Sequence, residues 1–289
     1  MEVEYSASIL RSDQLQALKS FRLKRVFIPY DLFFSGQLGI TDIDSLHHDC
    51  KSEVYISMPR IIRKRDADYL NSLKDFLKLG KADGVLIKNI DSLGYICSLK
   101  NDLESQYISI NASIDGFTPL YVISDHSLYN WNINSLDFNK DYTYAQTVPY
   151  ELSIHEIKEL VDRNLICIIY GRAPLMVSAN CVKRTTGTCD QSNNGCNFDH
   201  KLIDRKNKDS LVYNNCIHCY NEIYNSVPTS LHKYMWDLIK AGFHDFRLDF
   251  TDENCEIISK ILSYYVAEQR SGTFPLNEYT AAHISKGAV

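Results

Sequence analysis

Short apolar runs alternate with helical patterns along most of this chain. Five segments have helical spacing of apolar residues: Ser12–Phe21, Ala67–Leu79, Ser153–Asp162, Thr229–Ala241 and Asn254–Gln269. Eight runs have the character of buried strands: Tyr5–Leu10, Arg25–Pro29, Glu53–Pro59, Gly84–Lys88, Leu120–Ser124, Tyr144–Pro149, Leu165–Tyr170 and Asp245–Phe250. Buried strands that alternate with helices form parallel βαβ units. Eight such units predict an α/β fold, a closed (β/α)₈ barrel.

Two features of the pattern leave an alternative open. An open, doubly wound sheet would show the same alternation of strands and helices. A ninth strand-like run, Tyr107–Asn111, also weakens the count of eight. We therefore expect a barrel, with the open sheet as the second possibility.

Composition and charge narrow the class of protein. The chain has 289 residues, of which 45% are hydrophobic and 23% charged, so one domain over residues 1–289 can bury its own core. The net charge of -5 gives no bulk basicity of the kind that favours nucleic acid, although a local basic patch is still compatible with it. We see no export signal and no apolar run long enough to span a membrane, and we expect a cytoplasmic protein. In that reducing compartment, cysteines are metal ligands, reactive thiols or buried apolar residues.

Cysteines gather in one part of the sequence. Five of the nine fall between Cys181 and Cys219, after the seventh predicted strand, and we expect residues 178–228 to form a Cys-rich insertion. Within it, the stretch 182–215 is polar and lacks periodicity, so we interpret it as a long loop. Four thiolates suit a zinc ion or a [4Fe–4S] cluster. The spacing matches neither a zinc ribbon nor a ferredoxin, and His200 and His218 are additional candidate zinc ligands.

Polar residues follow the predicted strands at the end where barrel enzymes hold their active sites. These residues are Tyr30, Asp31, Arg60, Lys88, Asn89, Asp125, His126, Asn130, Asn132, Tyr150, Glu151, Arg172, Arg247 and Asp249. The cations among them (Arg60, Lys88, Arg172 and Arg247) favour an anionic substrate. Taken singly, charged residues at strand ends more often face water.

Motifs of well-known hydrolases and nucleotide-binding proteins are missing from the sequence. It has no G-x-S-x-G, H-E-x-x-H, P-loop or dinucleotide fingerprint. A cysteine nucleophile with a histidine base, Cys181 or Cys219 with His126, His200 or His218, stays open as an alternative.

Six segments carry a resemblance to a known family: Tyr170–Met176, Ser178–Cys181, Leu202–Lys206, Cys216–Pro228, Phe246–Thr251 and the tail Tyr279–Gly287. They resemble the collagenase-like peptidases, peptidase family U number 32, with Ala282 in place of the family's usual glycine. Asp125–Asn132 and Glu151–Ser153 also fit, so the match spans most of the chain. Departures around Ile166, Cys167, Pro174 and Leu175 resemble a divergent subgroup of longer proteins. The chain is therefore expected to be a shortened relative, or a portion of a larger protein that needs a further N-terminal region or a partner subunit.

The resemblance implies a barrel and a nominal peptidase activity. It also implies a [4Fe–4S] cluster held by cysteines and a part in oxygen-independent hydroxylation of RNA bases or ubiquinone precursors. By that resemblance Cys181 and Cys189 match two cluster ligands. We choose Cys216 and Cys219 as the other two, with Cys196 and Cys255 in reserve.

The resulting hypothesis is an iron–sulfur barrel enzyme that acts on RNA or a small anionic molecule. Arg172 and Arg247, with Lys88, would bind a carboxylate or phosphate, since a guanidinium suits both. Asn130 and Glu151, with Arg247, would act on the reacting group. His283 would either reach the mouth from the tail or only cap the fold. Two rival classes remain: a peptidase that uses a cysteine or bound zinc, and a non-catalytic module in which zinc staples the loop.

Overall fold

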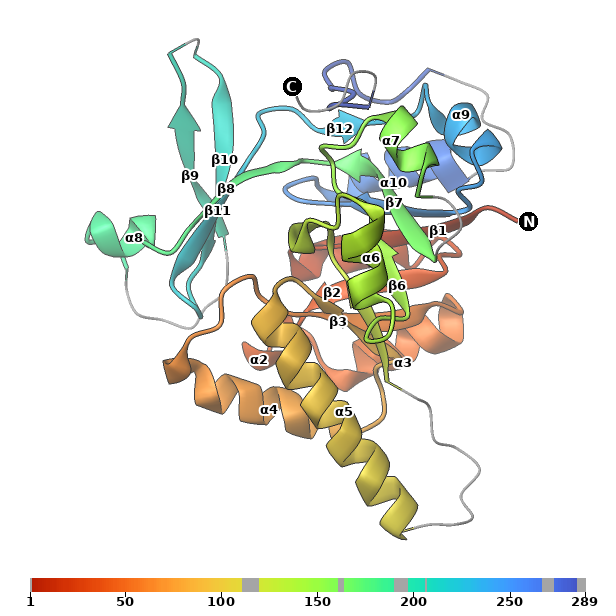
Figure 1. Cartoon of the computed structure of the whole chain (residues 1–289). Helices are drawn as coiled ribbons and strands as arrows, with labels where there is room; N and C mark the ends of the chain where they lie inside the picture. Colours follow the sequence, from red (N-terminus) through yellow and green to blue (C-terminus); the bar gives the residue numbers. More distant parts are fainter. Residues whose placement is uncertain are drawn as a thin grey trace.

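Eight parallel strands form a closed barrel in the computed structural model, which describes residues 2–110, 120–160, 164–189, 197–205, 207–266 and 273–284 (Figure 1). Each strand pairs with the next along the chain, and the last closes the ring against the first. The strands are β1 (Glu4–Ser8), β2 (Arg25–Pro29), β3 (Glu53–Ser57), β4 (Gly84–Ile87), β5 (Tyr121–Ser124), β6 (Ala145–Thr147), β7 (Leu165–Gly171) and β13 (Asp245–Asp249). The predicted (β/α)₈ barrel is therefore confirmed, and the open sheet is excluded.

Helices cover the barrel between these strands. They are η1 (Ser12–Gln14), α1 (Leu15–Leu18), α2 (Tyr30–Phe34), α3 (Ile40–Asp49), η2 (Lys64–Asp66), α4 (Ala67–Lys78), α5 (Ile90–Ile110), η3 (His126–Leu128), α6 (Ile133–Asn139), α7 (Ile154–Lys158), α9 (Met235–Lys240) and α10 (Cys255–Val266). One side-chain layer fills the barrel interior: Phe27, Tyr55, Leu86, Ile123, Ala145 and Ile166, each almost fully buried. The barrel is thus a packed core, and its usable space lies at the strand ends.

A second, antiparallel sheet leaves the barrel after β7 and returns before β13. Its strands are β8 (Pro174–Ser178), β9 (Asn197–Ile203), β10 (Asp209–Asn215) and β11 (Tyr220–Tyr224), in the order β8-β11-β10-β9, with helix α8 (Val182–Thr185) beside them. Figure 1 shows this sheet projecting to one side of the barrel. The insertion follows strand 7 as predicted, but its sheet already begins at Pro174 and ends at Tyr224.

Three local predictions were wrong. The run Tyr107–Ile110 belongs to helix α5, and Asn111 lies outside the described residues. The stretch 182–215 contains β9 and β10, where we expected a loop. The predicted helix from Thr229 begins instead with a short strand, β12 (Thr229–Ser230), which pairs antiparallel with the end of β7.

None of the helices in the described part of the chain is long and apolar enough to cross a membrane.

Candidate functional site

A pocket lies at the carboxyl ends of the barrel strands. It contains about 420 Å³ of empty space, part of it open to solvent. The four cations predicted for the mouth line it: Arg60, Lys88, Arg172 and Arg247. Other polar side chains lining it are Ser8, Asp125, His126, Tyr150, Glu222, Tyr224, Asp249 and Thr251. The mouth is therefore a mixed-charge site, and its chemistry depends on how these groups are paired.

Arg247 is buried beneath the mouth, between two carboxylates. Its guanidinium lies 2.7 Å from Asp125 and 2.7 Å from Asp249, and it covers the Phe27 ring at 5.3 Å. Burial alone would raise the pKa of Asp125, but His126 and Arg247 hold it well below its usual value. Arg247 is therefore neutralised by protein groups, and its main role in the described structure is to fix these two carboxylates.

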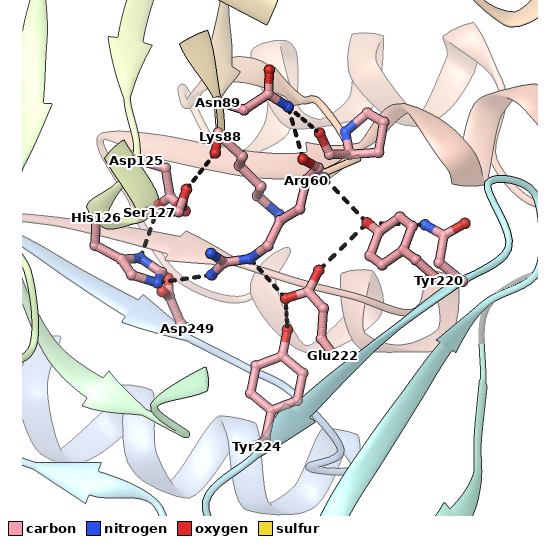
Figure 2. A network of polar contacts seen from close by, with 12 residues as sticks. Arg60, Lys88, Asn89, Asp125, His126, Ser127, Tyr220, Glu222, Tyr224 and Asp249 are labelled. Carbon is pink, nitrogen blue, oxygen red and sulfur yellow. Dashed lines mark hydrogen bonds and ion pairs between the residues drawn. The ribbon is translucent and has the colours of Figure 1, made fainter. Parts of the chain in front are cut away.

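His126 is held in one tautomer by its neighbours. Its Nε2 accepts from an Arg60 N–H at 3.0 Å, since arginine can only donate. Its Nδ1 lies 3.2 Å from the Asp125 carboxylate, which can only accept when ionised. In this arrangement Nδ1 donates to Asp125 and Nε2 accepts the Arg60 N–H. Figure 2 shows the Arg60 guanidinium between the His126 ring and Glu222.

Glu222 comes from the inserted sheet and was missed by the sequence analysis. Its carboxylate accepts from Arg60 Nε at 2.9 Å and from the Tyr224 hydroxyl at 2.9 Å (Figure 2). Burial and the neighbouring Glu222 raise the pKa of Tyr224 well above its usual range. The Tyr220 hydroxyl, on the same face of β11, accepts from the Arg60 backbone N–H at 3.2 Å. Alternate residues of β11 therefore complete the mouth, and their spacing of two was the signal available in the sequence.

The inserted sheet spans the mouth from side to side. It leaves from β7, and in the ring of eight strands β3 lies four positions away from β7 in either direction. The chain after β3 carries Arg60, which binds Glu222, and Asp66, whose carboxylate lies 2.9 Å from His218 Nδ1. The insertion thus bridges the barrel and is anchored on the far side.

Lys88 and Arg172 differ in whether their charged groups are available to bind a ligand. Arg172 is held by Asp252 at 2.9 Å and by the carbonyl oxygens of Asn225 and Ser226. These contacts fix the exit of the inserted sheet. The Lys88 ammonium is partly exposed and has no ion-pair or hydrogen-bond partner among the described residues; its charge reaches Asp125, whose pKa it lowers. Among the four cations of the mouth, Lys88 is the one whose side chain has no partner in the described part of the chain.

Asn130, Glu151 and His283 do not line the mouth pocket. Asn130 is buried beneath α6, where it binds Gln146 at 2.8 Å and Asn139 at 2.9 Å. Glu151 keeps one buried carboxylate oxygen without a partner in the described part of the chain. His283 is exposed on the C-terminal segment. The structure therefore places these three predicted residues outside the site formed by the cations.

The four predicted thiol ligands gather at the turn between β10 and β11. Cys181 precedes α8, Cys189 follows it, and Cys216 and Cys219 flank the turn. Burial raises the pKa of Cys216, Lys183 opposes the rise, and the charges of Cys181, Cys189 and Cys219 add to it. These four thiols are free of disulfides and lie within electrostatic range of Cys216.

A single metal ion needs tighter convergence than these thiols have. In the described part of the chain, no three His, Cys, Asp or Glu side chains are placed to hold one ion. The reserve Cys255 lies elsewhere, where its thiol donates to the Asp13 carbonyl at 3.1 Å, and Cys196 is outside the described residues. The candidate histidines have other partners: His200 contacts Asn214, and His218 contacts Asp31 and Asp66.

Comparison with known proteins adds only a weak likeness. No family model and no curated protein matches the chain. Orotidine 5'-monophosphate decarboxylase from Methanocaldococcus jannaschii is 14% identical over 58% of this chain and 81% of its own, with a TM-score of 0.38. The Bacillus cereus spore cortex-lytic enzyme SleL is 8% identical over 86% of this chain and 71% of its own, with a TM-score of 0.41. These likenesses carry no argument about function.

Proposed function

We propose that the protein is an iron–sulfur barrel enzyme that modifies an anionic substrate, an RNA base or a related small molecule, without using oxygen. The observation that carries the proposal is the course of β11. This strand starts next to Cys219 in the thiol group and places Glu222 and Tyr224 in the mouth. Cys219 and Glu222 are about 10 Å apart along the strand at roughly 3.3 Å per residue, so a cluster bound by Cys219 would lie close to the pocket.

The thiol set suits a cluster better than a single zinc ion. Sulfurs that share one tetrahedral zinc lie about 4 Å apart, given Zn–S bonds of roughly 2.3 Å. In a [4Fe–4S] cluster each cysteine binds a different iron, so the sulfurs stand farther apart. Cys181, Cys189 and Cys219 all lie within electrostatic range of Cys216, as four ligands of one cluster would. Cys181, Cys189, Cys216 and Cys219 would hold the cluster, which would supply single-electron chemistry.

The chain's own residues would bind and orient the substrate. The Lys88 ammonium would bind the anionic group, because the three arginines of the mouth are already paired with carboxylates. A substrate group that displaced the Arg60 N–H would reach His126 Nε2, which would take a proton from it. Asp125 would keep the ring in its tautomer.

Metal analysis tests the proposal directly. After anaerobic purification, we expect about four irons and four sulfides per chain, with broad absorption near roughly 400 nm. Cys181→Ala and Cys219→Ala should lose this absorption, whereas Cys97→Ala, on helix α5, and Cys255→Ala should keep it. One zinc and no iron would instead support the stapled module or a metallopeptidase. Full iron content in Cys181→Ala would refute the ligand assignment.

Substrate binding is tested separately with inorganic phosphate and short RNA oligonucleotides. Lys88→Met should weaken binding of each ligand at least tenfold, and Lys100→Met, on helix α5, serves as the matched control. If the wild-type protein and Lys88→Met bound these ligands equally well, the mouth would not be the anion-binding site. The cluster assignment would not be affected by that result.

A further inference from the structure

The barrel wall opens between β6 and β7 above the packed core. β6 pairs with β7 only at Gln146 with Leu165 and at Thr147 with Ile166. β7 continues to Gly171, where its partner is β12 instead. The chain that follows β6 therefore separates from the wall and leaves a gap beside the mouth.

A second cavity fills this gap, with about 300 Å³ of empty space that includes some open to solvent. Most of its lining residues are apolar, among them Leu152, Ile168, Leu231, Ala281 and Ile284, and Thr229 and Tyr150 add hydroxyl groups. Thr229 is 1% exposed, and its hydroxyl has no hydrogen-bond partner among the described residues. An apolar occupant would leave this hydroxyl unpaired, so the hydroxyl lowers the affinity of the cavity for apolar groups.

Tyr150 forms the partition between this side cavity and the mouth, since it lines both. Its hydroxyl is held weakly, by a 3.5 Å hydrogen bond to Asp249. Its ring stands edge-on to His126 at 5.1 Å between centroids. A rotation of this side chain would join the two spaces.

We propose that the side cavity receives an apolar group of the substrate, while the mouth holds its anionic group. The anionic group in the mouth rests on the proposed function, whereas the apolar group in the side cavity rests on the cavity alone. The substrate class is an amphiphilic anion whose apolar part is short, because the cavity is small. Tyr150 is then a specificity-determining residue that selects for this apolar part.

Binding of n-alkyl carboxylates of increasing length tests the side cavity. In the wild-type protein we expect the affinity measured by calorimetry to rise about fourfold per methylene until the cavity is full. Ala281→Leu, which fills part of the cavity, should flatten this dependence, and Ala67→Leu, at an exposed position on α4, should not. Thr229→Val keeps the side-chain shape and removes the unpaired hydroxyl, so it should bind alkyl chains at least as tightly as the wild type. A fall in its affinity, or equal slopes in wild type and Ala281→Leu, would overturn the proposal.

A series of n-alkanols tests the side cavity independently of anion binding in the mouth. Alkanols lack the anionic group, so their length dependence reports on the side cavity, and Lys88→Met should leave it unchanged. Carboxylate binding without any length dependence in either series would refute the side cavity and leave the mouth intact. If alkanol affinity rose with chain length but carboxylates bound no more tightly than alkanols, the side cavity would be supported. The same result would count against an anion-binding site in the mouth.

Discussion

Arg60 and Glu222 form an ion pair that joins the loop after β3 to strand β11 of the inserted sheet. Their side chains are 8% and 4% exposed, and the atoms lie 2.9 Å apart. Because both charges are removed from water, each depends on the other for compensation. This pair is therefore a buried electrostatic link between the barrel and its insertion at the mouth.

Loss of either partner should therefore destabilise the fold more than loss of both. Glu222→Ala or Arg60→Met alone leaves a buried charge and should lower the unfolding free energy by about 3–5 kcal/mol. The double variant should recover a large part of that loss. Urea unfolding of all four proteins gives the coupling energy. Additive single effects would mean that the two side chains do not compensate each other.

Asp125 should make stability depend on acidity. Its pKa is lowered in the folded protein, so its contribution is fully present above the unfolded-state value of about 3.9. That contribution is lost as the pH falls from there toward the folded-state pKa. Wild type should therefore lose stability on acidification more steeply than Asp125→Asn, and the gap between them should narrow below about pH 4. The unfolding free energies of the two proteins are measured from about pH 6 to about pH 2.5. A constant difference between them over this range would contradict the prediction.

A side chain at Gly171 should lower the stability of the folded protein. It has φ 144°, and a Cβ there would lie 2.7 Å from the Asp249 carbonyl oxygen and 3.1 Å from the Tyr150 hydroxyl. Gly171→Ala should cost about 2 kcal/mol or more through strain and displacement of Asp249. Gly94→Ala, in helix α5 with open space around it, should instead be neutral or stabilise by up to about 1 kcal/mol. Thermal denaturation compares the two, and similar melting temperatures would count against strain at Gly171.

Ala282 occupies the left-handed region of backbone conformation, with φ 49°. An L-residue is disfavoured there by roughly 1–2 kcal/mol, and the greater freedom of glycine in the unfolded chain offsets part of the gain. Ala282→Gly should therefore raise the unfolding free energy by about 0.5–1 kcal/mol. The neighbouring Ala281→Gly should lower it. Chemical denaturation that gives the same sign for both would show that backbone conformation does not decide the effect.

The sequence predicted the barrel well because each barrel strand carries its own local signal. Arg25–Pro29 is a strand over the full predicted range, and the other barrel runs differ by a few residues at their ends. Tyr107–Ile110 has the residue types of a strand, but it continues a helix that starts at Ile90. Local propensity is a weak guide where a longer element overrides it.

Site residues were harder to predict because their placement depends on the tertiary fold. Tyr129, with φ 54°, reverses the chain after η3, and Asn130 is thereby turned beneath α6 instead of into the mouth. Glu222 reaches the mouth only because a hairpin distant in sequence crosses the barrel. Lys88 and Asp125, by contrast, directly follow barrel strands, and the pocket contains both as the strand positions suggested.

The bridge across the mouth also sets the order in which the protein can assemble. The contacts that anchor it, Arg60 with Glu222, Asp66 with His218 and Asp31 with Asn215, join residues separated by 162, 152 and 184 positions. Contacts this distant in sequence carry a large loop-closure entropy, so they form late in folding. A nascent chain therefore cannot display the pocket before synthesis has passed Thr251, which also lines it, out of 289 residues. Hydrogen exchange during refolding should show the mouth gaining protection after strands β1 to β4.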